Sequence, residues 1–102
     1  MATSRKILSE KLLDDRVVRT AKNAGGIALK LLCLMFTGWP DRTVLLPGGR
    51  ICFAEIKTTG KKLSPRQEIV ISWLRTLGFT VFVVDDDNSY NEFVNWVNKN
   101  TT

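Results

Sequence analysis

The sequence predicts one α/β domain, in which a mixed β-sheet is covered by helices. Its 102 residues are the usual length of a single domain, so we assign one domain to residues 1–102. The expected elements follow the order α-β-β-β-α-β-α, in which a hairpin precedes a β-α-β connection; this combination makes a sheet mixed. Apolar residues make up 44% of the chain and charged residues 25%, a balance typical of globular proteins.

The first expected element is a helix over residues 5–23, with Ser4 suited to cap it and Gly25 and Gly26 suited to end it. At about 100° per residue, Glu10 falls on the apolar face of this helix. A carboxylate buried there would need a cation or a partner. Two interpretations stay open: Glu10 belongs to a charged site, or it lies at the solvent edge of a frayed first turn.

Three strands follow, and the last two form a hairpin. The β-rich run over residues 27–36 predicts a largely buried strand, and the break that follows it contains Pro40, which lacks an amide donor. The hairpin joins strands over residues 42–46 and 50–58 through Pro47-Gly48-Gly49.

The rest of the chain predicts a helix, a strand and a last helix. Ser64 is suited to cap the first of these helices and Pro65 to open it, and Gly78 ends it. Its apolar stripe consists of Ile69, Val70, Trp73, Leu74 and Leu77. A strand over residues 79–84 follows, and then a helix that Ser89 is suited to cap. The last helix carries Phe93, Trp96 and Val97.

Composition excludes several kinds of chemistry. The chain has no histidine, which excludes Ser-His-Asp and Cys-His catalysis and every metal site built on imidazole. Its two cysteines are too few for a structural zinc site without further ligands. Carboxylate, lysine and hard-cation chemistry remains.

Charge is distributed unevenly along the chain. Residues 1–79 carry fourteen basic and six acidic side chains, whereas residues 80–102 carry one basic and four acidic. This polarity favours contact between the first part and a polyanion. The longest apolar run, residues 31–36, is too short to span a membrane, and the first residues lack the apolar centre of a signal peptide. We therefore expect a cytoplasmic protein that has no membrane partner.

Two acidic residues are expected to meet across the hairpin. A three-residue turn with a glycine bulge places Asp41 opposite Glu55, whereas a two-residue turn would place it opposite Ile56. Glu55 and Lys57 are two residues apart and therefore share one face of the strand. Taken singly, Glu55 and Lys57 could form a structural ion pair and Asp41 a turn. Taken together, these interpretations leave two carboxylates crowded without a neutralising charge.

Two converging carboxylates are the oxygen ligands that Mg²⁺ prefers. Such an ion polarises a phosphate and lowers the pKa of a bound water, and Lys57 beside it can offset the charge that develops. The residues thus predict phosphodiester hydrolysis without histidine.

The motif Pro40-Asp41, with Glu55-Ile56-Lys57 fourteen residues after Asp41, resembles the PD-(D/E)xK nuclease pattern. The surrounding residues resemble the VRR-NUC family of virus-type replication-repair nucleases, especially its compact stand-alone members, over about residues 8–84. Those residues are Glu10, Gly38-Trp39, Thr58, Leu63-Ser64-Pro65-Arg66-Gln67 and Gly78. The resemblance implies a restriction-endonuclease-like α-β-β-β-α-β core, to which this chain adds a C-terminal helix.

By this resemblance, Asp41 and Glu55 are expected to be metal ligands and Ile56 to contribute its backbone carbonyl. Lys57 is expected to be the catalytic lysine, and Glu10 a further acidic residue that contacts the metal or its water. The cofactor is expected to be Mg²⁺, with Mn²⁺ able to substitute.

Gln67 matches the family's helix glutamine near the site, which would make it part of the catalytic set. It also stands three residues after Ser64, the spacing of a capping box in which the glutamine reaches back to the Ser64 amide. Both interpretations stay open.

Five basic residues are candidates to hold DNA phosphates around the cut site, the alternative being ordinary solvated surface charges. They are Arg42, Arg50, Lys61, Lys62 and Arg66. Trp39 could stack on an unpaired base or simply pack the bend.

The resemblance implies a metal-dependent endonuclease acting on DNA. Compact members of the family are associated with homodimers that cleave branched DNA such as Holliday junctions. A homodimer selective for branched DNA is therefore expected here as well. A host-cell cytoplasm and a phage gene fit this expectation. The alternatives are a nicking or flap-type nuclease without junction preference, a DNA-binding module without catalysis, and a basic protein of a virus particle. The dimer interface is expected either on the last helix, at Phe93, Trp96 and Val97, or around Phe36 and Trp39.

Overall fold

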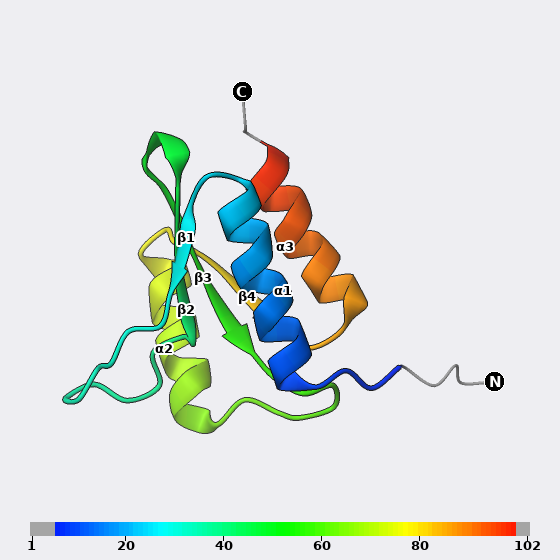
Figure 1. Ribbon diagram of the computed structural model, residues 1–102. Coiled ribbons are helices and arrows are strands. Elements are labelled where there is room, and N and C mark those ends of the chain that lie inside the picture. The colour runs from blue at the N-terminus through cyan, green and yellow to red at the C-terminus, as the bar shows by residue number, and fades with distance from the viewer. Residues whose placement is uncertain (1–5, 100–102) are drawn as a thin grey trace.

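The computed structural model describes residues 6–99, which form a four-stranded sheet with helices on both faces (Figure 1). The helices are α1 (Glu10–Asn23), α2 (Pro65–Thr76) and α3 (Asp87–Lys99). The strands are β1 (Ile27–Leu29), β2 (Arg42–Leu46), β3 (Arg50–Ile56) and β4 (Thr80–Val84). They lie in numerical order across the sheet; the first three are antiparallel and β4 is parallel to β3. The expected mixed α/β architecture is confirmed.

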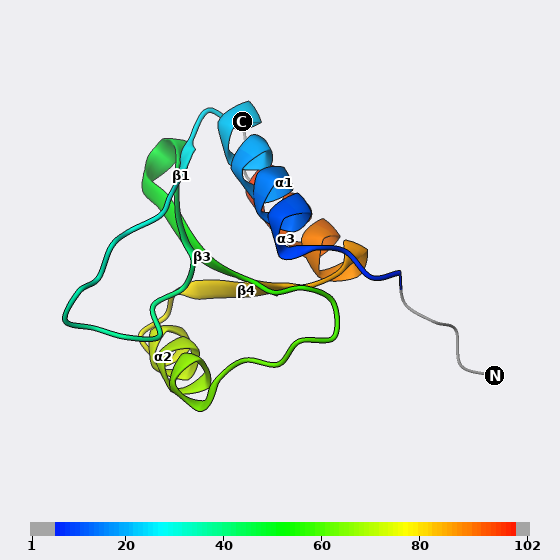
Figure 2. The same cartoon turned by 60° about the horizontal axis from the view of Figure 1, so that its bottom comes forward.

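Two hydrophobic cores lie on opposite faces of the sheet. Helices α1 and α3 lie side by side on one face and α2 covers the other, as Figure 2 shows. Leu13 and Val17 of α1 and Phe93 and Val97 of α3 are fully buried in the first core. The second core contains Phe53 of β3 together with buried residues of α2 and β4. Within residues 6–99, no helix is long and apolar enough to cross a membrane.

The register of the β2–β3 hairpin agrees with the three-residue turn expected from the sequence. Pro47–Gly49 form a short turn in which Gly48 and Gly49 have φ angles of 79° and 74°, a region that favours glycine. Leu46 pairs with Arg50 across this turn, and Arg42 pairs with Ala54 at the other end. One residue further along, Asp41 therefore reaches the level of Glu55.

Helix α1 starts at Glu10, five residues later than expected, and Ser9 caps it by accepting a hydrogen bond from the Leu12 amide. Ser4 lies outside the described residues. The backbone just before the helix is held elsewhere, because the Leu8 amide donates to the Thr59 hydroxyl at 3.0 Å. This tertiary contact fixes an extended segment where a helix was expected.

Strand β1 ends at Leu29, although the sequence predicted a strand through residue 36. Leu29 pairs with Thr43, the second residue of β2, so little partner strand remains beyond this point. The next residues towards the N-terminus of β2 include Pro40, which has no amide to donate. The chain instead forms a loop in which Met35 is 99% exposed, so the expectation of a largely buried strand was wrong. Strand β3 likewise ends at Ile56 rather than at residue 58.

Helix α2 begins at Pro65 with Ser64 as its cap, as expected, but its buried face is rotated. Val70, Ile71 and Leu74 contact the sheet, whereas Ile69 and Trp73, and Leu77 just after the helix, are about half exposed. The apolar stripe predicted from the sequence was therefore only partly correct. The apolar residues extend around more of the helix surface than the sheet covers.

Helix α3 begins at Asp87, and Ser89 does not cap it from outside. The Asp86 carboxylate accepts a hydrogen bond from the Ser89 amide at 2.8 Å, which is the capping contact. Phe93 and Val97 are fully buried against the sheet. They are therefore core residues. Neither is available for the dimer interface that was one of the two expected on the last helix.

Candidate active site

Asp41 and Glu55 meet at the end of the β2–β3 hairpin. The Asp41 amide donates to Glu55 Oε1 at 3.2 Å, and the Ile56 amide donates to Asp41 Oδ2 at 2.8 Å. These reciprocal bonds continue the ladder past the last backbone pair, with side-chain oxygens in place of carbonyls. The convergence expected from the turn is confirmed.

Glu55 is an acidic side chain in the interior, with only 1% of its surface exposed. Burial and, after it, the nearby Asp41 charge together raise the pKa of its carboxyl to about 7, against the opposing effect of Lys57. A buried carboxylate beside a second acid is electrostatically unfavourable, and a bound cation would relieve both effects.

Lys57 and Ile56 complete this end of β3. Lys57 Nζ lies 3.8 Å from Glu55 Oε2, and its side chain is 19% exposed, so the ammonium is within reach of both the acid and solvent. In a strand, the amide and carbonyl of one residue point to the same side. Because the Ile56 amide bonds Asp41, its carbonyl also faces the side of Asp41. Ile56 and Asp41 line a cavity of about 250 Å³.

The chain is similar to known proteins in sequence and in fold. The chain is 35% identical over 83 residues to "Putative nuclease p44" of Acyrthosiphon pisum secondary endosymbiont phage 1, a match covering 81% of this chain and 89% of that protein. A solved structure described as a VRR_NUC domain superposes with a TM-score of 0.78 at 27% identity, covering 85% of this chain and 96% of that one. The chain belongs to the VRR-NUC family of nucleases. No family model matches it.

In this VRR-NUC domain, Gln67 joins α2 to the acidic pair. Its Oε1 accepts from the Ser64 amide at 2.8 Å and its Nε2 donates to Glu55 Oε2 at 2.9 Å. The Ser64 hydroxyl in turn accepts from the Gln67 amide, which completes a capping box. The capping interpretation is confirmed, and Gln67 also contacts the Glu55 carboxylate; that it belongs to the catalytic set stays a prediction.

Glu10 approaches the same cavity from α1 but stays exposed. Its amide donates to the Thr58 hydroxyl at 3.2 Å, so the residue after Lys57 fixes the start of the helix. Glu10, Asp41 and Ile56 all line the cavity. Within residues 6–99, however, no three acidic or cysteine side chains lie close enough together to hold one ion. Glu10 is thus across the cavity from the acidic pair and not part of a three-acid cluster.

Two of the expected DNA-binding arginines have structural partners instead. Arg42 makes a two-pronged ion pair with Asp14, at 2.8 and 2.7 Å, and donates to the Ala28 carbonyl. Arg50 donates to the carbonyls of Trp96 and Val97 at the end of α3. Carbonyls at a helix end lack partners of their own, and an acid on the facing helix attracts an arginine. Both side chains are only partly exposed and already have partners, which makes Arg42 and Arg50 less available for the expected phosphate contacts.

The other three expected cations lie on the surface beside the site. Arg66 donates to the Thr37 carbonyl at 3.1 Å and lies over the Phe36 ring at 5.0 Å, so it anchors the loop before Asp41. Lys61 and Lys62 are exposed in the loop between β3 and α2. All three stay candidates for phosphate contacts.

Trp39 packs the bend, as one of its two interpretations held. Its ring meets the Phe53 ring edge-on at 5.3 Å, and its indole nitrogen donates to the Thr43 hydroxyl. It belongs to the edge of the second core and is not a free stacking surface.

Two residues that line the cavity were not predicted from the sequence: Asp14 and Lys30. Asp14 stands four residues after Glu10 and so shares its helix face, a signal that was present in the sequence. Its pKa is lowered by the hydrogen bonds from Arg42. Lys30 follows β1 directly.

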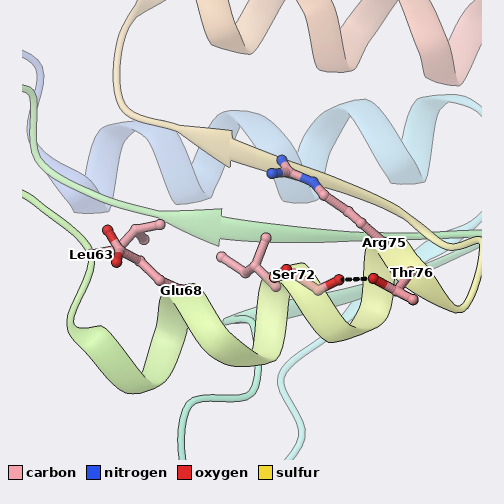
Figure 3. A pocket seen from close by; sticks show the side chains of 6 residues that line it. Leu63, Glu68, Ser72, Arg75 and Thr76 are labelled. Atoms are coloured by element: carbon pink, nitrogen blue, oxygen red, sulfur yellow. Dashed lines mark hydrogen bonds between the residues drawn. The ribbon is translucent and has the colours of Figure 1, made fainter.

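A second hollow, of about 430 Å³, lies along α2 and is drawn in Figure 3. Two of the polar side chains that line it already have partners in the protein: Arg75 donates to the Val81 carbonyl and Thr76 to the Ser72 carbonyl. The hollow includes none of the acids at the end of β3, so the chemistry of the protein lies elsewhere.

Proposed function

We propose that this protein is a metal-dependent endonuclease that hydrolyses DNA phosphodiester bonds, acting preferentially on branched DNA. The observation that carries the proposal is the meeting of Asp41 and Glu55: the Asp41 amide donates to the Glu55 carboxylate, the Ile56 amide donates to the Asp41 carboxylate, and Lys57 lies beside them. The phage relative named as a nuclease and the VRR_NUC structure support the same chemistry. We place this activity in the cytoplasm of the host cell.

The donor set fits Mg²⁺, or Mn²⁺ in its place. Magnesium in nucleic-acid enzymes is bound by one or two carboxylates and completes its octahedron with water and phosphate oxygens. Asp41, Glu55 and the Ile56 carbonyl would hold it, and within residues 6–99 hydrogen bonds occupy only one of the two Asp41 carboxylate oxygens. When bound, the ion supplies Lewis-acid stabilisation of the phosphate and a water of lowered pKa.

Lys57 and Glu10 act from two sides of this position. The Lys57 ammonium stabilises negative charge that develops on the phosphate and holds the attacking water by hydrogen bonding. Glu10 is exposed across the cavity, a position suited to accept a hydrogen bond from a water rather than to reach the ion directly. Gln67 holds Glu55 so that its carboxylate keeps one orientation.

We further propose that the active form is a homodimer, since two sites related by a two-fold axis suit symmetric cuts in a branched substrate. Exposed apolar side chains around Phe36 support this face as the interface. They include Leu34, Met35, Ile69 and Trp73. Analytical ultracentrifugation of the wild type and of Trp73→Glu tests the proposal: the charge should give a monomer, and an unchanged sedimentation coefficient contradicts this interface.

The test of function is cleavage of labelled four-way junction, flap, nicked and linear duplex DNA with Mg²⁺, Mn²⁺ or EDTA. We expect cuts at the junction with either metal and none in EDTA, and loss of cutting in Asp41→Asn. Lys57→Ala is expected to lose turnover while still binding the ion and keeping its fold. Equal cutting of all four substrates would leave a nuclease without junction preference. No cutting, with DNA binding unaffected by Asp41→Asn, would indicate a DNA-binding module.

A further inference from the structure

The cavity beside Asp41 carries charges of both signs. It is lined by Glu10, Lys11 and Asp14 from α1, by Lys30 after β1, and by Asp41 and Ile56 from the acidic end of the hairpin. Lys11 and Lys30 thus border the same space as Asp41, one of the two acids assigned to the metal. None of the five cations expected from the sequence lines it.

The charged side chains of this cavity differ in their partners. Asp14 is held by Arg42 through two short hydrogen bonds. Lys11 pairs with Asp15 at 3.1 Å, but this pair is highly exposed and is expected to contribute little. Lys30 is exposed and makes no ion pair within residues 6–99, although its charge contributes to the lowered pKa of Asp14. Within residues 6–99, an ammonium group without an ion-pair partner therefore borders the cavity.

Arg42 also explains why Lys30 keeps this position. The Arg42 guanidinium donates to the Ala28 carbonyl and to Asp14, and so ties β1 to β2 and α1 just before Lys30. The Arg42 contacts thus hold the backbone just before Lys30, while the Lys30 side chain is exposed. An exposed ammonium suits a contact to a backbone phosphate, which needs charge more than fixed direction.

We propose that Lys30, supported by Lys11, binds a DNA backbone phosphate next to the phosphate that is cut. The inference rests on the proposed nuclease function and adds one side of the substrate path. The strand would cross the acidic pair with one neighbouring phosphate at Lys30 and Lys11 and, on the other side, the lysines of the loop after β3. Binding by Lys30 involves no base and is independent of sequence.

The experiment measures the binding of fluorescein-labelled four-way junction and linear duplex DNA by anisotropy, in EDTA, over a series of salt concentrations. The variants are Lys30→Ala, Lys30→Arg and the matched control Lys22→Ala, which removes the same charge from the far end of α1. Lys30→Ala should weaken binding several-fold and reduce the slope of log Kd against log salt by about 0.9, the value for one lost phosphate contact. Lys30→Arg should keep the slope, and Lys22→Ala should leave it unchanged.

Equal effects of Lys30→Ala and Lys22→Ala would overturn the inference, because they would show that only total charge matters. Absence of DNA binding by the wild type would overturn it as well. In turnover with Mn²⁺, Lys30→Ala should raise KM more than it lowers kcat. If the wild type cuts none of the DNAs but Lys30→Ala still reduces the slope of log Kd against log salt, the proposed nuclease function is contradicted and the phosphate contact is supported.

Discussion

The end of β3 and the first turn of α1 each carry an acidic side chain of the candidate site, but they hold it differently. Glu55 is 1% exposed, and its two oxygens accept hydrogen bonds from Asp41 and Gln67. Glu10 is exposed, and the bond that fixes it joins its backbone amide to the Thr58 hydroxyl. The carboxylate of Glu55 is buried and hydrogen-bonded. The carboxylate of Glu10 is exposed, and only its backbone amide is held.

This difference separates two ways in which a fold can supply a carboxylate. Burial and the neighbouring Asp41 raise the pKa of Glu55 to about 7. The ionised form of Glu55 is therefore unfavourable in the folded protein, and a bound cation would stabilise it. An exposed acid carries no such penalty and exerts less control over a bound ion. Changes at the end of β3 should therefore have larger effects than changes at the start of α1.

The largest effect is expected for Glu55→Gln, which keeps the shape and removes the charge. Cleavage with Mn²⁺ should fall by about three orders of magnitude, the loss typical of removing a preorganised charge from an active site. Single-turnover assays on a four-way junction measure it, with Glu68→Gln on the surface of α2 as control. Cleavage by Glu55→Gln within tenfold of the wild type would show that this carboxylate does not hold the ion.

The next effect concerns stability and pH. The pKa of Glu55 is about 7 in the folded protein against 4.5 in the unfolded chain, so the folded state binds more protons between these values. Stability is therefore greatest below pH 4.5 as far as this group is concerned, and is lost as the pH rises through about 7. Between pH 5 and pH 8 the loss should be about 2 to 3 kcal/mol in EDTA.

Urea unfolding of the wild type and of Glu55→Gln at both pH values isolates this contribution, because the glutamine cannot titrate. The difference between the two proteins should favour the variant at pH 8, and Mn²⁺ should stabilise the wild type more than the variant. The same pH dependence in both proteins would contradict the raised pKa.

A smaller effect is expected at Gln67, where the capping role and the contact with Glu55 can be separated. Both Gln67→Ala and Ser64→Ala should cost about 1 kcal/mol of stability, since each breaks the capping box. Only Gln67→Ala should also lower cleavage, by about 10- to 100-fold, as expected for a group that orients a metal ligand. Thermal unfolding and cleavage rates measured on both variants decide this; equal rates would mean that Gln67 only caps the helix.

The smallest effect is expected for Glu10→Gln. An exposed side chain acting through water should cost less than about tenfold in cleavage, and it should leave Mn²⁺ affinity almost unchanged. Cleavage rates measured across a range of Mn²⁺ concentrations test both parts. A loss as large as that of Glu55→Gln would remove the distinction between the two regions and make Glu10 a direct ligand.

The acidic pair could be predicted because its position depends on local chemistry. Pro47-Gly48-Gly49 sets the turn, the turn sets the register, and the register brings Asp41 to Glu55. The two-fold spacing of a strand then places Lys57 on the same face. Each step uses residues close in sequence, so no long-range contact had to be known.

The errors came from contacts between distant segments. Helix α1 begins later than expected because Thr58 and Thr59 bind the segment at its start. Arg42 looked available to DNA until the packing of α1 on the sheet brought Asp14 within 2.7 Å. The strand expected through residue 36 lost its partner because β2 begins only at Arg42.

The central claim is that Asp41 and Glu55 together hold one divalent cation. Isothermal titration calorimetry of Mn²⁺ and of Mg²⁺ into the chelator-treated protein tests it most directly, with Asp41→Asn as the matched variant. We predict one ion per chain in the wild type and loss of that binding in Asp41→Asn. Absence of binding by the wild type, or equal binding by both proteins, would contradict the claim.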